Sequence, residues 1–250
     1  MNDQTQQSRK WWAPALMIGS IVGLVCLPLG ALGSKLGMWS FLGGFMLLAV
    51  GTVLAAAVFF LGVIALAYCF AKKRSAERGS VFIGVAISAV ILGLMGSQYM
   101  AASSVPPIHN ISTDTQQPPQ FDKIVAIRAA QEGVNSLAYD ANVLAEQQRA
   151  AYPSIQPLIS SVSSDELLSQ AVEVIESMGL EVVNADASAG IVEATDTTFW
   201  FGFKDDVVVR VKPQGRGSIV DVRSVSRVGE SDLGKNAARI SEILAGIKSY

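Results

Sequence analysis

The sequence predicts an α+β protein in which a region of three transmembrane helices, residues 1–102, precedes a domain, residues 103–250. The domain is expected to have two layers and a mainly antiparallel four-stranded sheet. Half of the 250 residues are hydrophobic and the mean hydropathy is +0.39, an excess that lies almost entirely before Met100. After Ser103 the acidic residues gather, and after Gly179 the periodicity changes from helix to short valine-rich strands. The net charge of −2 gives no overall basic surface, so no nucleic-acid partner is expected.

Three apolar runs predict helices that cross a lipid bilayer, at about residues 12–33, 39–71 and 80–100. The first run has the length needed for a hydrocarbon core of roughly 30 Å, and Trp11 and Trp12 are typical interfacial anchors. The second run exceeds one membrane thickness but is too short for two helices with a turn, so we expect one long, tilted helix. A cleaved signal peptide is the alternative for the first run, which is longer than a signal's apolar core.

The positions of Lys and Arg predict the orientation in the membrane, because positive residues near helix ends are retained on the cytoplasmic side. Two of them lie in the amino-terminal tail and four in the second loop, whereas the first loop has only Lys35 and the third helix is followed by none until Lys123. The amino terminus is therefore predicted to be cytoplasmic and the domain extracytoplasmic. The six retained residues are Arg9, Lys10, Lys72, Lys73, Arg74 and Arg78.

Small residues recur every four positions in the first and third runs, as in Gly19 and Gly23 and in Ser80, Gly84 and Ser88. This spacing predicts close packing of the three helices, with self-association as the alternative. None of the three runs contains Asp, Glu, Lys, Arg or His, which argues against an ion or proton pathway. The two cysteines, Cys26 and Cys69, lie inside the apolar runs, so no thiolate metal site and no cofactor are expected.

The first part of the domain has weaker patterns. Residues 101–120, rich in Ser, Pro, Gln and Asn, predict a linker or an extended arm. Residues 121–128 alternate weakly and predict a short strand, and residues 140–150 predict a helix that Pro153 ends.

The second part has clear periodicity. A helix is predicted to begin at Ser163, with Glu166 at the capping-box position, and to stop at Gly179. Four strands are predicted at 180–184, 190–195, 206–212 and 218–226, and a last helix from Ser231 or Asp232 to about Ile247. The short spacings favour an antiparallel meander with both helices on one face.

Alternation along the strands places Glu193, Arg210, Asp221 and Arg223 together on the face of the sheet without helices. One interpretation is a salt-bridge ladder that fixes the register of the strands. The other is an anion site near the start of the last helix, whose free backbone N–H groups favour negative charge. Its candidate residues are Arg210, Arg223, Arg227 and Ser231, and Asp232 is the capping residue that an arginine there would otherwise pair with.

Other candidate residues have weaker support. His109 is the only histidine and could act with Asp114 as an acid–base pair or a metal ligand, although a structural histidine is the simpler interpretation. Asp205 and Asp206 could bind a cation or work as paired carboxylates, but a turn before a strand also explains them. Asp196 is a further candidate for catalysis.

Four aromatic residues surround Gly202. They predict a loop that stacks on a ligand or faces the bilayer, with packing at the edge of the sheet as the alternative. They are Phe199, Trp200, Phe201 and Phe203.

Several motifs occur in the same order as in a known family: PPIHNIST at 106–113, QRAAYPSIQPL at 148–158, IVEATDTTFWFGFKDDVVVRV at 191–211 and DVRSVSRVGESDLGKNAARI at 221–240. They resemble the bacterial domain-of-unknown-function family 1499 over nearly all of residues 103–248. Residues 128–130, Arg-Ala-Ala, depart from it, because the family tends to have proline after the arginine. The resemblance implies an envelope-associated bacterial domain, sometimes fused to membrane helices, and implies no reaction and no catalytic residues.

Taken together, these patterns predict a bacterial inner-membrane protein that displays a periplasmic binding or interaction module. Its expected partners are the lipid bilayer and an anionic envelope component or a membrane protein. The alternative is a cell-envelope enzyme acting on a small or lipid-linked substrate through His109, Asp196 and Arg223. A pocket that unites His109 with Arg223, Arg227 and Asp206 would favour the enzyme, whereas an open, charged sheet face would favour the binding module.

Overall fold

The computed structural model describes residues 10–248, so Arg9 of the predicted orientation signal lies outside the described residues. The chain divides into two compact units. Of the described residues, the first unit contains those up to Ala101 together with Phe199–Gly202, and the second contains Ala102–Thr198 and those from Phe203 onward.

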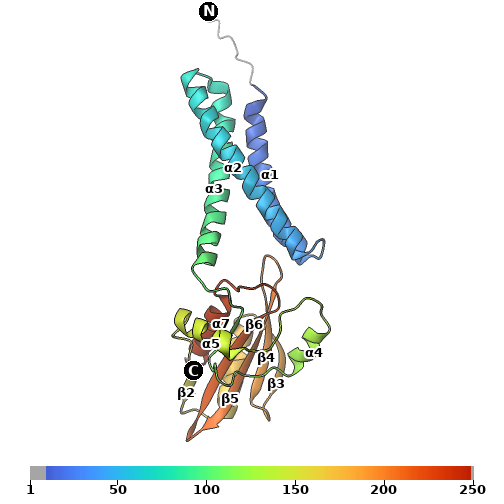
Figure 1. Cartoon of the computed structure of the whole chain (residues 1–250), viewed down its shortest axis with the longest axis vertical. Coiled ribbons are helices and arrows are strands. Elements are labelled where there is room, and N and C mark those ends of the chain that lie inside the picture. Colours follow the sequence, from blue (N-terminus) through green and yellow to red (C-terminus); the bar gives the residue numbers. More distant parts are fainter. Residues whose placement is uncertain (1–9, 249–250) are drawn as a thin grey trace, which may run out of the picture. The chain divides into compact units, whose positions relative to one another are not determined.

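Three long helices form most of the first unit: α1 (Trp12–Lys35), α2 (Phe41–Ala71) and α3 (Ser75–Ser103) (Figure 1). Each is long and apolar enough to cross a membrane. This confirms the three predicted helices, including the single long helix of 31 residues at α2. The third helix begins at Ser75, five positions before the predicted residue 80, and its first turn includes Glu77, which bonds to Arg74 just before the helix.

Small residues let the helices of the first unit approach closely. A Cβ added to Gly23 of α1 would lie 3.0 Å from the backbone oxygen of Gly51 in α2, and one added to Gly84 of α3 would lie 3.3 Å from Leu16 of α1. The helix faces formed by small residues therefore pack against other helices of the same chain, as the four-residue spacing predicts.

A buried carboxylate at the start of α3 was not expected from the sequence. Glu77 is fully buried, and its Oε1 accepts hydrogen bonds from Arg74 Nη2 at 2.9 Å and from the backbone N–H of Lys10 at 3.3 Å. The uncharged run predicted from the sequence begins at residue 80, three positions after Glu77. The helix α3 begins earlier and therefore contains this carboxylate.

The second unit is built on one antiparallel sheet of six strands in the order β1-β6-β5-β4-β3, with β2 also paired to β6. The four strands predicted from the sequence correspond to β3–β6, and the antiparallel meander is confirmed. The strand count of four was wrong. The missed strands, β1 and β2, have only three residues each, too few for an alternating pattern. The strands are β1 (Asn110–Ser112), β2 (Leu158–Ser160), β3 (Glu181–Asp186), β4 (Ile191–Thr197), β5 (Lys204–Gln214) and β6 (Gly217–Ser226).

Two of the predicted helices of the domain are confirmed: α5 (Ala141–Ala151) and α6 (Ser164–Ser177). The side chain of Ser163 accepts the backbone N–H of Glu166 at 3.4 Å, and Gly179 has a φ of +80° at the stop.

Residues 121–128 were predicted as a strand and instead lead into the helix α4 (Lys123–Ala129). The buried carboxylate of Glu193 on β4 accepts the backbone N–H groups of Asp122 at 2.8 Å and Lys123 at 2.9 Å. Glu193, which is far away in the sequence, thus accepts the backbone N–H groups that have no partner within the first turn of α4. The local sequence pattern of residues 121–128 cannot reveal this interaction.

The last helix, α7 (Lys235–Lys248), begins later than the predicted Ser231 or Asp232. Leu233 and Gly234 have φ of +55° and +79°, which breaks the helical path before Lys235. The carboxylate of Asp232 accepts the backbone N–H groups of Gly234 at 2.8 Å and Asn236 at 2.7 Å, so the helix start is already capped by the chain itself.

Helices α6 and α7 pack on one face of the sheet around a valine- and isoleucine-rich core. The opposite face was predicted to be free of helices and is not. Phe121 and Ile124 pack there against Val208 and Val225, in a second, smaller core. The segment of residues 113–139, which includes α4, is called the arm from here on; it lies over this face because the sheet presents both apolar and charged side chains to it.

Candidate functional site

The face beneath the arm carries the charged residues predicted to share it. Register places Val208 opposite both Glu193 and Arg223, and Arg210 opposite Asp221. Alternation along the strands was therefore a correct guide to which side chains share a face.

Asp206 is the centre of a buried ion cluster. Its Oδ2 accepts hydrogen bonds from Arg128 Nε at 2.6 Å and Arg227 Nε at 2.9 Å, and its Oδ1 accepts from Arg227 Nη2 at 2.7 Å and Thr195 Oγ1 at 2.8 Å. Burial would raise the pKa of Asp206, but these hydrogen bonds outweigh it and hold the pKa below its usual value. The carboxylate thus joins the arm, through Arg128, to the end of β6, through Arg227.

Arg223 is buried and bonded only to uncharged groups. Its Nε donates to Asn110 Oδ1 at 3.1 Å and its Nη1 to the backbone oxygen of Pro119 at 3.0 Å, while Nη2 donates to the backbone oxygen of Leu137. The guanidinium carbon lies 5.5 Å and 5.8 Å from the ring centroids of Phe121 and Tyr139.

The charge of Arg223 survives this burial. Burial lowers its pKa to about 10, which leaves the guanidinium protonated at neutral pH. Among the ion pairs of residues 10–248, none involves Arg223. Carbonyl dipoles and aromatic faces therefore hold the cation in place of a carboxylate.

Among the ion pairs of the described residues, only Arg210–Asp221 joins two members of the predicted ladder. Arg210 Nη2 lies 2.7 Å from Asp221 Oδ2 and 3.1 Å from Asp114 Oδ2, and its Nη1 donates to the backbone oxygen of Gln117 at 2.9 Å. Asp114 also accepts two backbone N–H groups of the arm, from Gln116 and Gln117. Asp114 therefore fastens the arm to Arg210, and none of its described bonds is to His109.

Asp205 and Asp206 lie within β5 rather than in a turn before it, and they point to opposite faces of the sheet. Arg239 of α7 binds Asp205 at 2.8 Å and Asp196 at 2.5 Å. The two neighbouring aspartates are thus bonded to different arginines and do not form a paired-carboxylate site. No group of three or more His, Cys, Asp or Glu suited to a metal ion occurs among the described residues.

His109 and Ser231 lie near the loop before α7. His109 Nδ1 is 3.4 Å from the backbone oxygen of Glu230, and Ser231 Oγ accepts the backbone N–H of Leu233 at 3.2 Å. Neither side chain has a described bond to Arg223, Arg227 or Asp206. The arginines of the candidate anion site already bond to protein groups, and binding of an anion there stays a prediction.

These contacts show what the charged residues do in the fold. Arg128, Arg210 and Arg223 each link the arm to the sheet, and Glu193 holds the start of α4. Sequence reasoning missed Arg128 and Arg239 as partners. The presence of charged residues inside valine-rich strands could have indicated such partners, because a buried charge requires an oppositely charged or hydrogen-bonding group.

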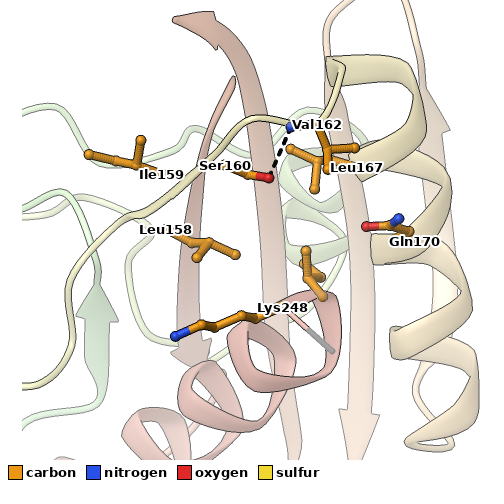
Figure 2. Close-up of a pocket in the computed structure, with 8 residues that line it drawn as sticks. Leu158, Ile159, Ser160, Val162, Leu167, Gln170 and Lys248 are labelled. Carbon is orange, nitrogen blue, oxygen red and sulfur yellow. Dashed lines mark hydrogen bonds between the residues drawn. The ribbon is translucent and has the colours of Figure 1, made fainter. Parts of the chain in front are cut away.

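A cleft lies beside β2, between this strand and the helices α6 and α7, as Figure 2 shows. Its volume is about 130 Å³, and Leu158, Val162, Leu167 and Ile247 give it apolar walls. Gln170 and Lys248 are polar residues at its margin, and Ser160 Oγ accepts the backbone N–H of Val162 at 3.1 Å. The cleft contains none of the charged residues described above.

The fold and the site define a class of protein: three candidate membrane helices joined to an α+β domain whose charged residues clamp its own arm. A family model described as "Protein of unknown function (DUF1499)" matches residues 110–247, from β1 into α7. The chain belongs to this family, and the resemblance carried by the sequence motifs is confirmed. The comparison with curated proteins found none that matches the chain.

Proposed function

We propose that the chain is an integral protein of the bacterial inner membrane that displays a non-catalytic binding module in the periplasm. Its partner is another envelope protein, which contributes an extended segment to the free edge of β2. The cleft beside this edge is the observation that carries the proposal.

The orientation rests on the charges near the helix ends. Lys72 and Lys73 follow the end of α2, and Arg74 precedes α3, so a compact turn between two candidate spans holds three positive charges. The turn between α1 and α2 has only Lys35 at its start. The positive-inside rule then assigns the α2–α3 turn to the cytoplasm and the domain after α3 to the periplasm.

Fusing alkaline phosphatase after residue 250 tests this orientation. We expect an active phosphatase in a bacterial host and no signal from a reporter that matures only in the cytosol. The matched control places each reporter in the α2–α3 turn. There the phosphatase should be inactive and the cytosolic reporter should give a signal. An inactive phosphatase with a bright cytosolic reporter at residue 250 would refute the periplasmic placement.

A binding role is favoured over catalysis because the ionisable candidates are engaged in structure. Asp206, Asp205 and Asp221 are buried against arginines, and the described cleft has no histidine and no carboxylate in its lining. An acid or base needs access to a substrate proton, which these buried ion pairs do not offer.

The size of the cleft selects the kind of partner. Pockets for small-molecule ligands usually have about 300–1,000 Å³, whereas about 130 Å³ suits one apolar side chain. In the described sheet β2 pairs only with β6, so its other edge is free for strand addition. Ile159, 72% exposed, adds apolar surface next to that edge.

Site-specific photo-crosslinking tests the partner and the surface together. A benzophenone amino acid at Ile159 of the full chain, expressed in bacterial membranes, is expected to form one protein adduct whose crosslinked peptide contains an apolar residue. Gln170→Phe, which fills the cleft, should abolish the adduct, and Gln170→Ala should keep it.

The same probe at Val125, 49% exposed on α4, is the control for nonspecific capture. Equal adducts at both positions, or an adduct that survives Gln170→Phe, would contradict the proposal. An adduct with lipid or glycan would instead favour the anionic envelope component that the sequence also predicts.

A further inference from the structure

The loop between β4 and β5, residues 198–203, is short and closed at its base. The backbone N–H of Thr198 donates to the backbone oxygen of Phe203 at 2.8 Å, and the backbone N–H of Phe203 donates to Thr198 Oγ1 at 2.9 Å. Gly202 has a φ of +69°, which allows the tight return. The loop therefore presents its tip, residues 199–202, away from the sheet.

Two large aromatic side chains at this tip remain exposed. Phe199 is 70% exposed and Trp200 is 55% exposed, and their rings pack edge to face with centroids 5.2 Å apart. Among residues 104–248 no other aromatic side chain is as exposed. Lys35 Nζ lies 5.0 Å from the ring centroid of Phe199 and donates to its backbone oxygen at 2.9 Å, yet most of both rings stays exposed, and this exposure points to a binding role.

The strand register places this loop at a particular end of the sheet. Thr197 is opposite Lys204, Asp205 is opposite Ser226, and Val225 is opposite Asn110, the first residue of β1. The loop thus leaves the sheet at the end where the chain enters it. From the end of α3 at Ser103 to Asn110 there are seven residue steps, which span at most about 25 Å.

The two ends of the sheet differ in composition. At the end where the chain enters, the connection after β6 also exposes an apolar residue, Leu233, at 48%. At the opposite end the hairpin turns are residues 187–190, Ala-Ser-Ala-Gly, and residues 215–216, Gly-Arg, with no large apolar side chain. Exposed apolar bulk therefore gathers at the end tethered to a candidate membrane span.

From this placement we infer that the loop of residues 198–203 docks into the interfacial region of the bilayer that the chain's own helices cross. Tryptophan and phenylalanine favour this region because it accepts both apolar rings and the indole N–H. Lys204, exposed directly after the loop, suits the anionic headgroups. The inference holds on either side of the membrane and does not depend on the cleft at β2.

Fluorescence of Trp200 in the full chain tests the inference. The variant Trp11→Phe, Trp12→Phe and Trp39→Phe leaves Trp200 as the single tryptophan, and it is reconstituted in vesicles of phosphatidylcholine and phosphatidylglycerol with iodide on both sides. We expect blue-shifted emission, several-fold weaker quenching by iodide than in the control below, and strong quenching by lipids brominated near the headgroup end of their chains.

The control moves the probe to the opposite end of the sheet: Trp200→Phe together with Ile159→Trp in the same background. This tryptophan should be quenched by iodide and not by brominated lipid. Equal iodide quenching at both positions would overturn the inference, as would a Trp200 shielded from iodide but insensitive to brominated lipid, which would mean burial in protein.

A second probe keeps the result independent of the tryptophan substitutions. An environment-sensitive dye on Phe199→Cys, with Cys26→Ala and Cys69→Ala, should report an apolar interfacial surrounding in vesicles. A dye emission equal to that of the same dye on Ile159→Cys would also refute the docking of the loop on lipid.

Discussion

Asp206→Asn is expected to destabilise the α+β domain by about 3–5 kcal/mol, the usual cost of removing one partner of a buried ion pair. The substitution keeps the shape of the side chain and removes its charge. Arg128 and Arg227, both nearly buried, would then face an uncharged amide, whose own N–H₂ group meets two sets of donors. Since domains are stable by only about 5–15 kcal/mol, this is a large share of the total.

Urea unfolding of the domain within the full chain in detergent, followed by pulse proteolysis, measures this change. Glu242→Gln, at an exposed position on α7, is the matched control and should change the free energy of unfolding by less than about 0.5 kcal/mol. A loss below about 1 kcal/mol for Asp206→Asn would show that the cluster contributes little to the fold.

The pH dependence of the same measurement follows from the lowered pKa of Asp206. In the unfolded chain the pKa of an aspartate is about 3.9. A lower pKa in the folded domain means that folding favours the ionised carboxylate. This contribution is present above the unfolded pKa and is lost as the pH falls through the folded pKa. The difference between the natural chain and Asp206→Asn should therefore be constant near neutral pH and shrink below about pH 4; a difference that grows in acid would contradict the assignment.

The elements that the sequence predicts correctly are those with enough residues to show a period. The three apolar helices, α5, α6 and the strands β3–β6 each carry their own pattern. By contrast, β1 and β2 have three residues each and form only because β6 offers them an edge. The helix α4 depends on Glu193, about 70 positions away in the chain.

The candidate site shows the same division between local and distant information. Alternation assigned Glu193, Arg210, Asp221 and Arg223 to one face, since side-chain direction in a strand is a local property. It could not assign their partners. Arg128 reaches Asp206 across 78 positions, and Pro119 reaches Arg223 across 104, so the arm that covers this face becomes visible only in the folded chain.

Arg223→Ala is expected to release the arm from the sheet and to cost about 2–4 kcal/mol. Three oxygens that now accept from the guanidinium would lose their donor, at about 1–3 kcal/mol each when they stay buried. The relief from burying a cation without a carboxylate partner offsets part of this sum. Arg223→Lys should lose nearly as much, because one ammonium group cannot reach acceptors on Asn110, Pro119 and Leu137 at once.

Hydrogen exchange followed by mass spectrometry distinguishes this local role from general destabilisation. Backbone amides of the arm, residues 113–139, should exchange faster in Arg223→Ala, while those of β4 and β5 keep their protection, because α6 and α7 still cover the opposite face of the sheet. Arg216→Ala removes an exposed arginine from the turn between β5 and β6, outside the arm, and should leave the exchange of the arm unchanged. Faster exchange spread evenly over the whole domain, or full rescue by Arg223→Lys, would mean that Arg223 does not act by clamping the arm. Inorganic phosphate that protects the natural chain but not Arg223→Ala would instead support the anion site.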